Sequence, residues 1–255
     1  MNPVRLHHVD EGPRDAPAIV LSGSLGSTLQ MWRPQVAALT ERFRVVRVDH
    51  RGHGGSPVPA GPYTIGELAG DVLALLDELG LDRVAWCGLS MGGMIGMYLG
   101  SEAPHRLSSL TLCCTSSYFP DKTVWRDRIA AVRDAGTAPI AAGVASRWFT
   151  PEWAERNPDA VAEATDMIAG TPDDGYLACC QAIEAWDHRD RLPSITLPTL
   201  VIAGDADPST PVDPHARTIA DAIPGARLEV LHAAHLATIE RAAEATPLIA
   251  AHAAL

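Results

Sequence analysis

The feature that most restricts the possible folds is an alternation of short apolar runs, rich in Val, Ile and Leu, with longer stretches of helical periodicity. Runs of this length suit strands buried on both faces, and the stretches between them suit crossover helices of a parallel sheet. The runs occupy residues 18–22, 44–49, 83–88, 107–114, 199–204 and 227–232, and residues 67–80 form an apolar helical stripe that ends at a glycine. The alternation predicts an α/β protein with a doubly wound, mostly parallel sheet.

Residues 117–192 interrupt this alternation, because they contain no convincing buried strand and are broken by prolines. Several tryptophans fall in this segment, namely Trp125, Trp148, Trp153 and Trp186. We expect a core domain made of residues 1–116 and 193–255, with residues 117–192 inserted over the sheet as a helical cap. Each tryptophan is expected either to fill the core of the cap or to face a pocket.

The segment GLSMGG, residues 88–93, lies where an expected strand turns into a helix-like stretch. A serine flanked by glycines at such a turn is the pattern of a nucleophile elbow, whose strained serine backbone presents an exposed hydroxyl. Side chains at Gly88 and Gly92 would clash with the closely packed backbone of this turn. The pattern therefore predicts Ser90 as a nucleophile, and the alternative is a glycine-rich turn with an incidental serine.

A serine hydroxyl is a poor nucleophile and needs a base, usually a histidine oriented by a carboxylate. In chains with this elbow the acid and then the histidine follow the serine, each just after a strand. The loops after the last two expected strands offer Asp205 and Asp207, and then His232 and His235. We predict Asp207 and His235, because Asp205 is expected to brace the turn and His232 still belongs to the strand pattern.

Acyl transfer also requires hydrogen-bond donors for the developing oxyanion. One is expected to be the backbone N–H of Met91, directly after the nucleophile, and the other an N–H of the loop SGSLGS. In that loop Ser24 is the preferred residue and Leu25 the alternative. His50 and His53 lie in the segment DHRGHGGS at the same edge of the sheet, where we expect them to stabilise the turn by hydrogen bonding.

The formal net charge of −11 argues against a nucleic-acid partner, since phosphate binding needs clustered Lys and Arg. The N-terminal segment lacks an apolar run behind a basic start, and the chain has no apolar run long enough to span a membrane. The cysteines show neither metal-ligand spacing nor a disulfide framework, so we expect them to be buried. These observations predict a cytoplasmic protein with a small-molecule substrate, and they leave the oligomeric state open.

The segments SGSLGS, DHRGHGGS, GLSMGG, GDADPSTP and HAAHLATIE together resemble the α/β-hydrolase superfamily over nearly the whole chain. Within it, LSGSLGSTLQMW and the cap segments SRWFTPEW, TPDDGYLACCQAI and DHRDRL are most similar to the 3-oxoadipate enol-lactone hydrolases of the β-ketoadipate pathway. The resemblance implies the α/β-hydrolase fold with a helical cap. The chain departs from it at Ser22-Gly23, where most members carry His-Gly, and at AAH before the predicted histidine, where a glycine is commoner.

The resemblance implies a substrate with a five-membered enol lactone and an acetate arm, opened by water to 3-oxoadipate without a metal or organic cofactor. The substrate carboxylate would need a cation from the cap, and an arginine suits it because its planar fork binds carboxylates bidentately. We expect this cation to be Arg133, with Trp148 as an apolar wall. Other cap arginines that could serve are Arg126, Arg147, Arg189 and Arg191.

Other serine-dependent members of the superfamily would share the same catalytic residues and differ only in the cap. They include general carboxylesterases, cofactor-free perhydrolases and carbon–carbon bond hydrolases. A hydrolase with an aspartate nucleophile is excluded because the elbow carries Ser90. A catalytically inactive member that serves as a ligand receptor is the alternative from a different class.

Overall fold

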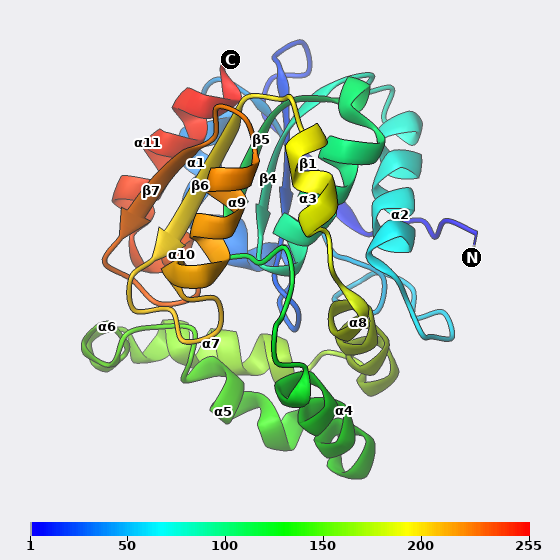
Figure 1. Cartoon of the computed structure of the whole chain (residues 1–255), viewed down its shortest axis with the longest axis vertical. Helices are drawn as coiled ribbons and strands as arrows, with labels where there is room; N and C mark the ends of the chain where they lie inside the picture. The colour runs from blue at the N-terminus through cyan, green and yellow to red at the C-terminus, as the bar shows by residue number, and fades with distance from the viewer. Residues whose placement is uncertain (1) are drawn as a thin grey trace.

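A seven-stranded sheet in the order β1-β3-β2-β4-β5-β6-β7 runs through the centre of the protein in a computed structural model that describes residues 2–255 (Figure 1). The strands are β1 (His8–Glu11), β2 (Ala18–Ser22), β3 (Arg44–Val48), β4 (Val84–Leu89), β5 (Leu107–Cys113), β6 (Thr199–Gly204) and β7 (Arg227–Leu231). All neighbours pair in parallel except β1, which pairs with β3 in the antiparallel sense. The mostly parallel sheet expected from the apolar runs is therefore confirmed.

The strand that the apolar pattern missed is β1 at the edge of the sheet. Its sequence HVDE carries charged residues because it lies half-buried, and its carboxylates pair with arginines of β3. Asp10 contacts Arg44, and Glu11 contacts Arg47 at 2.6 Å. Charged side chains of this kind are common on edge strands, where they discourage pairing with other chains.

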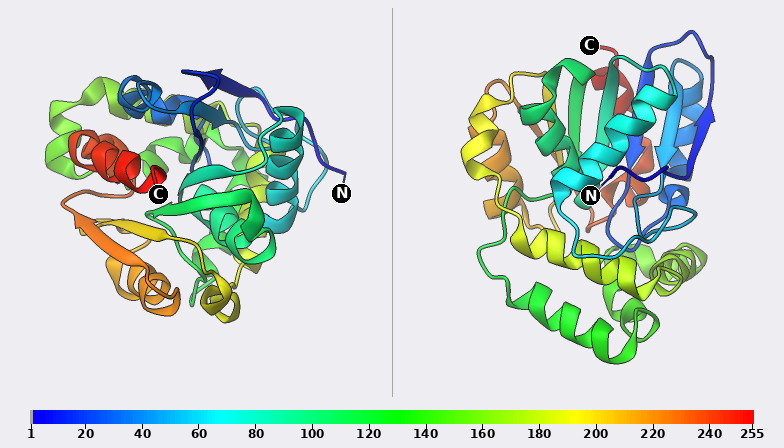
Figure 2. Two further views of the ribbon diagram at one scale, coloured as in Figure 1. Left: turned by 90° about the horizontal axis from the view of Figure 1, so that it is seen from above. Right: turned by 90° about the vertical axis from the view of Figure 1, so that its right-hand side faces the viewer.

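Helices cover both faces of the sheet (Figure 2). On one face α1 (Arg33–Thr40) packs against α11 (Ala242–Ala253), with α10 (Ala237–Glu240) leading into α11. On the other face α2 (Ile65–Glu78) packs against α3 (Met91–Glu102), and α9 (Arg217–Ala222) lies beside β7. The helix predicted at 67–80 begins earlier because Thr64 caps it, in a capping box with Glu67.

The remaining helices lie together beyond the carboxyl ends of the parallel strands (Figure 1). They are α4 (Thr123–Ala135), α5 (Ala141–Ala145), α6 (Pro151–Arg156), α7 (Pro158–Ala169) and α8 (Asp173–Ala185). All fall within the predicted cap at 117–192, although the two domain boundaries stay a prediction. Across residues 2–255, no helix combines the length and the apolar character needed to cross a bilayer.

The order of the strands determines where a ligand can bind. Strand β2 lies between β3 and β4, so the chain passes from β2 to β3 on one side and then crosses back past β2 to reach β4 on its other side. Ligands of open α/β sheets bind outside the carboxyl ends of the strands at such a switch point. The loops that follow β2 and β4 contain Ser24 and Ser90, and both loops therefore open towards the helices α4 to α8.

Candidate active site

Ser90 occupies a strained turn between β4 and α3. Its φ of 57° lies in the left-handed region, which is unfavourable for any residue with a Cβ atom. Its amide donates to the carbonyl of Cys113 at 2.9 Å, and its own carbonyl accepts from the Thr115 hydroxyl at 2.6 Å. These bonds to the neighbouring strand hold the strained serine in place.

The glycines beside Ser90 are required by close backbone approaches. A Cβ atom on Gly88 would overlap the carbonyl of Gly92, and one on Gly92 would overlap the carbonyl of Ser22 in β2. The amide of Gly92 also donates to the carbonyl of Gly23 at 2.9 Å. The steric reason predicted for both glycines is therefore confirmed.

Asp207 and His235 form a buried pair. Nδ1 of His235 lies 2.8 Å from Oδ2 of Asp207, and His235 and Asp207 are 4% and 3% exposed. A carboxylate only accepts, so Nδ1 carries a proton and Nε2 is the nitrogen that can act as a base. The Asp207 carboxylate also accepts from the amides of Ser209 and Thr210 and from the Thr210 hydroxyl.

The environment of Asp207 favours its charged form. Burial alone would raise the pKa of its carboxyl, but the charge and hydrogen bond of His235, with the donors of Thr210 and Ser209, hold the pKa below its ordinary value. Asp207 is therefore ionised at neutral pH and fixes the tautomer and orientation of the imidazole.

The alternative acid and histidine also contact each other, but on the surface. Nδ1 of His232 lies 3.0 Å from Asp205, and their side chains are 64% and 47% exposed. The structure thus places Asp207 and His235 together in a buried site, and Asp205 and His232 in solvent.

Ser90 and His235 line one cavity of about 290 Å³, a size that admits only a small molecule. Ser24, Leu25 and Trp148 also line it. The preferred and the alternative oxyanion residue therefore both border the cavity, and the choice between them stays open. Apolar walls come from the helices α4 and α5 and from the segments beside them, through Phe119, Val124, Trp125, Val144 and Trp148.

Arg133 is not brought to this cavity. It is exposed and lines a separate surface hollow with Asp174, whereas Arg128 lines the cavity. The reason is helical phase, since residues five apart on a helix point about 140° away from each other. Arg128 lies three residues after Trp125, on the same face of α4, and its guanidinium stacks 5.1 Å from that indole.

Among the other predicted arginines, Arg147 lines the cavity and donates to the carbonyl of Pro208 at 3.1 Å. The rest pair with carboxylates at the surface, Arg126 with Glu184, Arg189 with Asp187 and Arg191 with Glu102. The cations available to a ligand in the cavity are therefore Arg128 and Arg147.

His215 also lines the cavity, and no sequence pattern singled it out. Its Nδ1 lies 2.7 Å from the Ser116 hydroxyl, and burial lowers its pKa, so the imidazole is neutral at neutral pH. Over residues 2–255 no three His, Cys, Asp or Glu side chains gather closely enough to hold a metal ion.

Known proteins share both the sequence pattern and the fold of this chain. The family model described as alpha/beta hydrolase fold matches residues 17–242. A relative from Acinetobacter baylyi named 3-oxoadipate enol-lactonase 2 is 38% identical over 93% of this chain and 89% of its own length. A relative from Stutzerimonas stutzeri named "Putative carbamate hydrolase RutD" is 33% identical over 86% of this chain and 84% of its own.

Among solved structures, the enol-lactonase from Burkholderia xenovorans LB400 superposes on this chain with a TM-score of 0.95. It is 43% identical in sequence, and the alignment covers 98% of this chain and 96% of that one. The likeness therefore extends through the helices α4 to α8, two of which line the cavity, as well as through the sheet.

Proposed function

Since the chain belongs to the α/β-hydrolase family and is a carboxylic ester hydrolase, we propose that it opens 3-oxoadipate enol-lactone with water to give 3-oxoadipate, in the catabolism of aromatic compounds. The observation that carries the proposal is one cavity that combines Ser90 and His235 with Arg128 and Arg147. A small anionic lactone needs both a nucleophile for its ring and a cation for its free carboxylate.

The first half of the reaction forms an acyl-enzyme. Ser90 Oγ attacks the lactone carbonyl carbon while Nε2 of His235 takes the hydroxyl proton, and Asp207 stabilises the resulting imidazolium. The oxyanion accepts the N–H of Met91, the first residue of α3, and an N–H from Ser24 or Leu25. The ring C–O bond then breaks, and the enolate oxygen that leaves receives the proton from His235.

The second half releases the product. Water enters beside the tethered enol, gives its proton to His235 and attacks the acyl carbon, and the bond to Ser90 Oγ breaks as that oxygen regains a proton from His235. The enol then becomes a ketone, which makes the ring opening favourable. In both halves, Nε2 of His235 accepts and returns each proton that moves at the reacting acyl group.

Arg128 and Arg147 replace Arg133 as the proposed partners of the substrate carboxylate. The two guanidinium groups reach the cavity from different elements, α4 and the segment after α5. Trp148 and Trp125 form apolar walls beside them, which exclude water and strengthen each charge–charge contact. A neutral lactone or a simple aryl ester would offer these cations no carboxylate.

The test is the loss of ultraviolet absorbance of freshly prepared 3-oxoadipate enol-lactone, followed with wild type, Ser90→Ala and Arg128→Gln. We expect rapid loss with wild type and only the spontaneous rate with Ser90→Ala. We expect a raised KM with Arg128→Gln, while Arg126→Gln on the same helix behaves as wild type because its partner is Glu184 at the surface.

Hydrolysis of a carbamate or of a simple ester is the second candidate, because the same residues would serve and one relative carries the carbamate hydrolase name. Faster turnover of an aryl ester or carbamate than of the lactone would favour it and overturn the lactone assignment. Failure of a fluorophosphonate to label Ser90 in the folded wild type would instead favour a non-catalytic receptor.

A further inference from the structure

Two buried histidines reach the loop that carries the second oxyanion donor, here called the oxyanion loop (residues 23–26). His50 and His53 come from the loop after β3, and they are 3% and 0% exposed. Nε2 of His53 accepts the amide of Gly26 at 2.9 Å, and Nε2 of His50 lies 3.2 Å from the carbonyl of Gly23. The two bonds therefore hold the two ends of the oxyanion loop.

Their partners fix the tautomer of each histidine. Because the Gly26 amide donates to Nε2 of His53, the proton of His53 is on Nδ1, which faces the carbonyl of Arg51 at 3.3 Å. The Gly23 carbonyl only accepts, so a hydrogen bond to it requires the proton of His50 on Nε2, which also lies 3.2 Å from the Ser22 hydroxyl. Burial lowers the pKa of both side chains to about 4, which keeps both rings neutral at neutral pH and leaves Nε2 of His53 able to accept from Gly26.

The Gly23 carbonyl also joins the oxyanion loop to the nucleophile elbow. It accepts from His50 and from the amide of Gly92, two residues after Ser90. Gly26 adopts a φ of 78°, which only glycine adopts readily, and Ser27 closes the turn by donating to the Ser24 carbonyl. The peptide groups between Gly23 and Gly26 are thus held at both ends and have little freedom to move.

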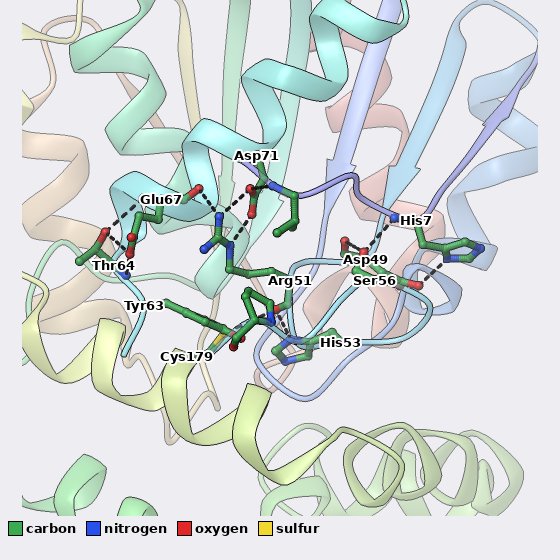
Figure 3. A network of polar contacts seen from close by, with 12 residues as sticks. His7, Asp49, Arg51, His53, Ser56, Tyr63, Thr64, Glu67, Asp71 and Cys179 are labelled. Carbon is green, nitrogen blue, oxygen red and sulfur yellow. Dashed lines mark hydrogen bonds and ion pairs between the residues drawn. The ribbon is translucent and has the colours of Figure 1, made fainter. Parts of the chain in front are cut away.

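The loop that carries both histidines is held by a network of polar contacts, and Figure 3 shows the part of this network around His53. Arg51, between the two histidines, forms a buried two-bond ion pair with Asp71 of α2. Asp49 accepts from the amides of Leu29 and Gly55 and contacts the ring of His7. The loop after β3 is therefore fixed by contacts with other elements, and it can impose a position on the oxyanion loop.

We propose that His53 and His50 are positioning residues that set the second oxyanion donor at the distance the tetrahedral intermediate needs. The proposal rests on the proposed function and deepens it, because it concerns the same site. A misplacement of about 1 Å costs on the order of 100-fold in rate, since the donor is then out of line with the oxyanion. The sequence pattern alone suggests only that these histidines stabilise their own turn.

A pair of substitutions at His53 separates the two roles. The side-chain amide of His53→Asn can still donate to the Arg51 carbonyl but is too short to accept from Gly26. The longer His53→Gln can place its oxygen where Nε2 accepts from Gly26, but it gives up the bond to Arg51. We expect His53→Asn to lower kcat by about 100-fold with KM nearly unchanged, and His53→Gln to retain most of the activity.

His252→Gln is the matched control, because His252 is also buried and its Nε2 bonds a backbone carbonyl, that of Pro198 at 3.1 Å, but it belongs to α11 outside the site. It is expected to keep the wild-type kcat. Each protein is assayed with the enol lactone and with p-nitrophenyl acetate, whose hydrolysis needs the oxyanion donors but not lactone specificity. A wild type that cleaves only the aryl ester would refute the lactone assignment and still test the positioning of the loop.

A trifluoromethyl ketone forms a tetrahedral adduct with serine. Its affinity would not change if His53 only stabilised the fold. Its affinity should weaken in His53→Asn in parallel with kcat, while the affinity for 3-oxoadipate stays the same. Equal activity of both variants, a loss confined to His53→Gln, or a rise in KM at unchanged kcat would overturn the proposal. If His53→Asn fails to fold, His53→Gln still decides: wild-type affinity for the ketone supports the proposal, and weak affinity in a folded protein overturns it.

Discussion

Replacing Asp71 by Asn should be among the most destabilising isosteric changes in this chain. Asp71 and Arg51 are each 1% exposed, and their two hydrogen bonds measure 2.5 and 2.6 Å. Asp71 also accepts the amide of Val4 at 2.7 Å. Asparagine keeps the shape of the side chain but removes the charge, and it leaves a buried guanidinium without a counter-ion.

The expected loss follows from that burial. Removing one partner of a buried ion pair costs about 3–5 kcal/mol, because the other charge stays in a medium that solvates it poorly. Nη1 of Arg51 lacks a hydrogen-bond partner among residues 2–255, and the other contacts of the guanidinium are a long bond from Nη2 to the Glu67 carbonyl at 3.5 Å and the ring of Tyr63. For a domain of this size each kcal/mol lowers Tm by roughly 2–4 °C, which predicts a decrease of about 6–20 °C.

Urea denaturation followed by circular dichroism measures the free energy of unfolding directly. The control is Asp77→Asn on the same helix, whose carboxylate contacts Arg106 at 2.9 Å but is 70% exposed, so its loss should stay below about 1 kcal/mol. The double variant Arg51→Met with Asp71→Leu should lose less than Asp71→Asn, because it removes both charges. An Asp71→Asn protein as stable as Asp77→Asn would refute the reasoning.

Three further outcomes can be measured on the same protein. Gly92→Ala should fail to react with a fluorophosphonate, because the added methyl group overlaps a backbone carbonyl of β2, whereas Gly70→Ala, with open space around it, should react normally. Asp207→Asn should lower kcat by about 10⁴-fold while the cavity keeps its shape, because the imidazole loses its correct tautomer. The folded state lowers the pKa of His53 from 6.5 to about 4, so as the pH decreases His53 takes up a proton in the unfolded chain before it does so in the folded protein. The free energy of unfolding should therefore fall as pH decreases from 6.5 towards 4, and it should fall less in His53→Gln, in denaturation curves taken across this range.

The elements that sequence predicts well are those whose cause is local. Strands β2 and β6 have the predicted boundaries, because a strand buried on both faces must be apolar throughout. The other predicted strands agree within a residue, including β7, which is only partly buried. The elbow around Ser90 was predictable because its glycine spacing is visible in the sequence, although only Gly88 is required by a local contact, and Gly92 is required by the approach of β2. Strand β1 was not, because its half-buried edge position allows polar residues.

The cap shows where prediction from sequence stops. The sequence of the cap does not determine which face of each helix lies towards the sheet. It therefore could not show that Arg128 reaches the cavity and Arg133 does not. The spacing of Trp125 and Arg128 on one helical face was the available signal, and it becomes useful only if one tryptophan is already known to line the pocket. His215 gave no signal, because it approaches from a segment after β6 whose path depends on tertiary packing.

The predicted base is attached to the wall of the cavity, and this limits how independently substrate choice and catalysis can change. The amide of Leu236 donates to the carbonyl of Trp148, and the amide of Ala234 donates to the Glu240 carboxylate at 3.0 Å. Glu240 also accepts from the amide and hydroxyl of Thr150, two residues after Trp148. His235 is thus held on both sides by the segment that shapes the ligand space, and a change at 148–150 that alters the fit of a substrate also shifts the imidazole. A new substrate class therefore requires coordinated changes in the cap and in the histidine loop, because replacement of the cap alone would remove the two Thr150 donors of the buried Glu240.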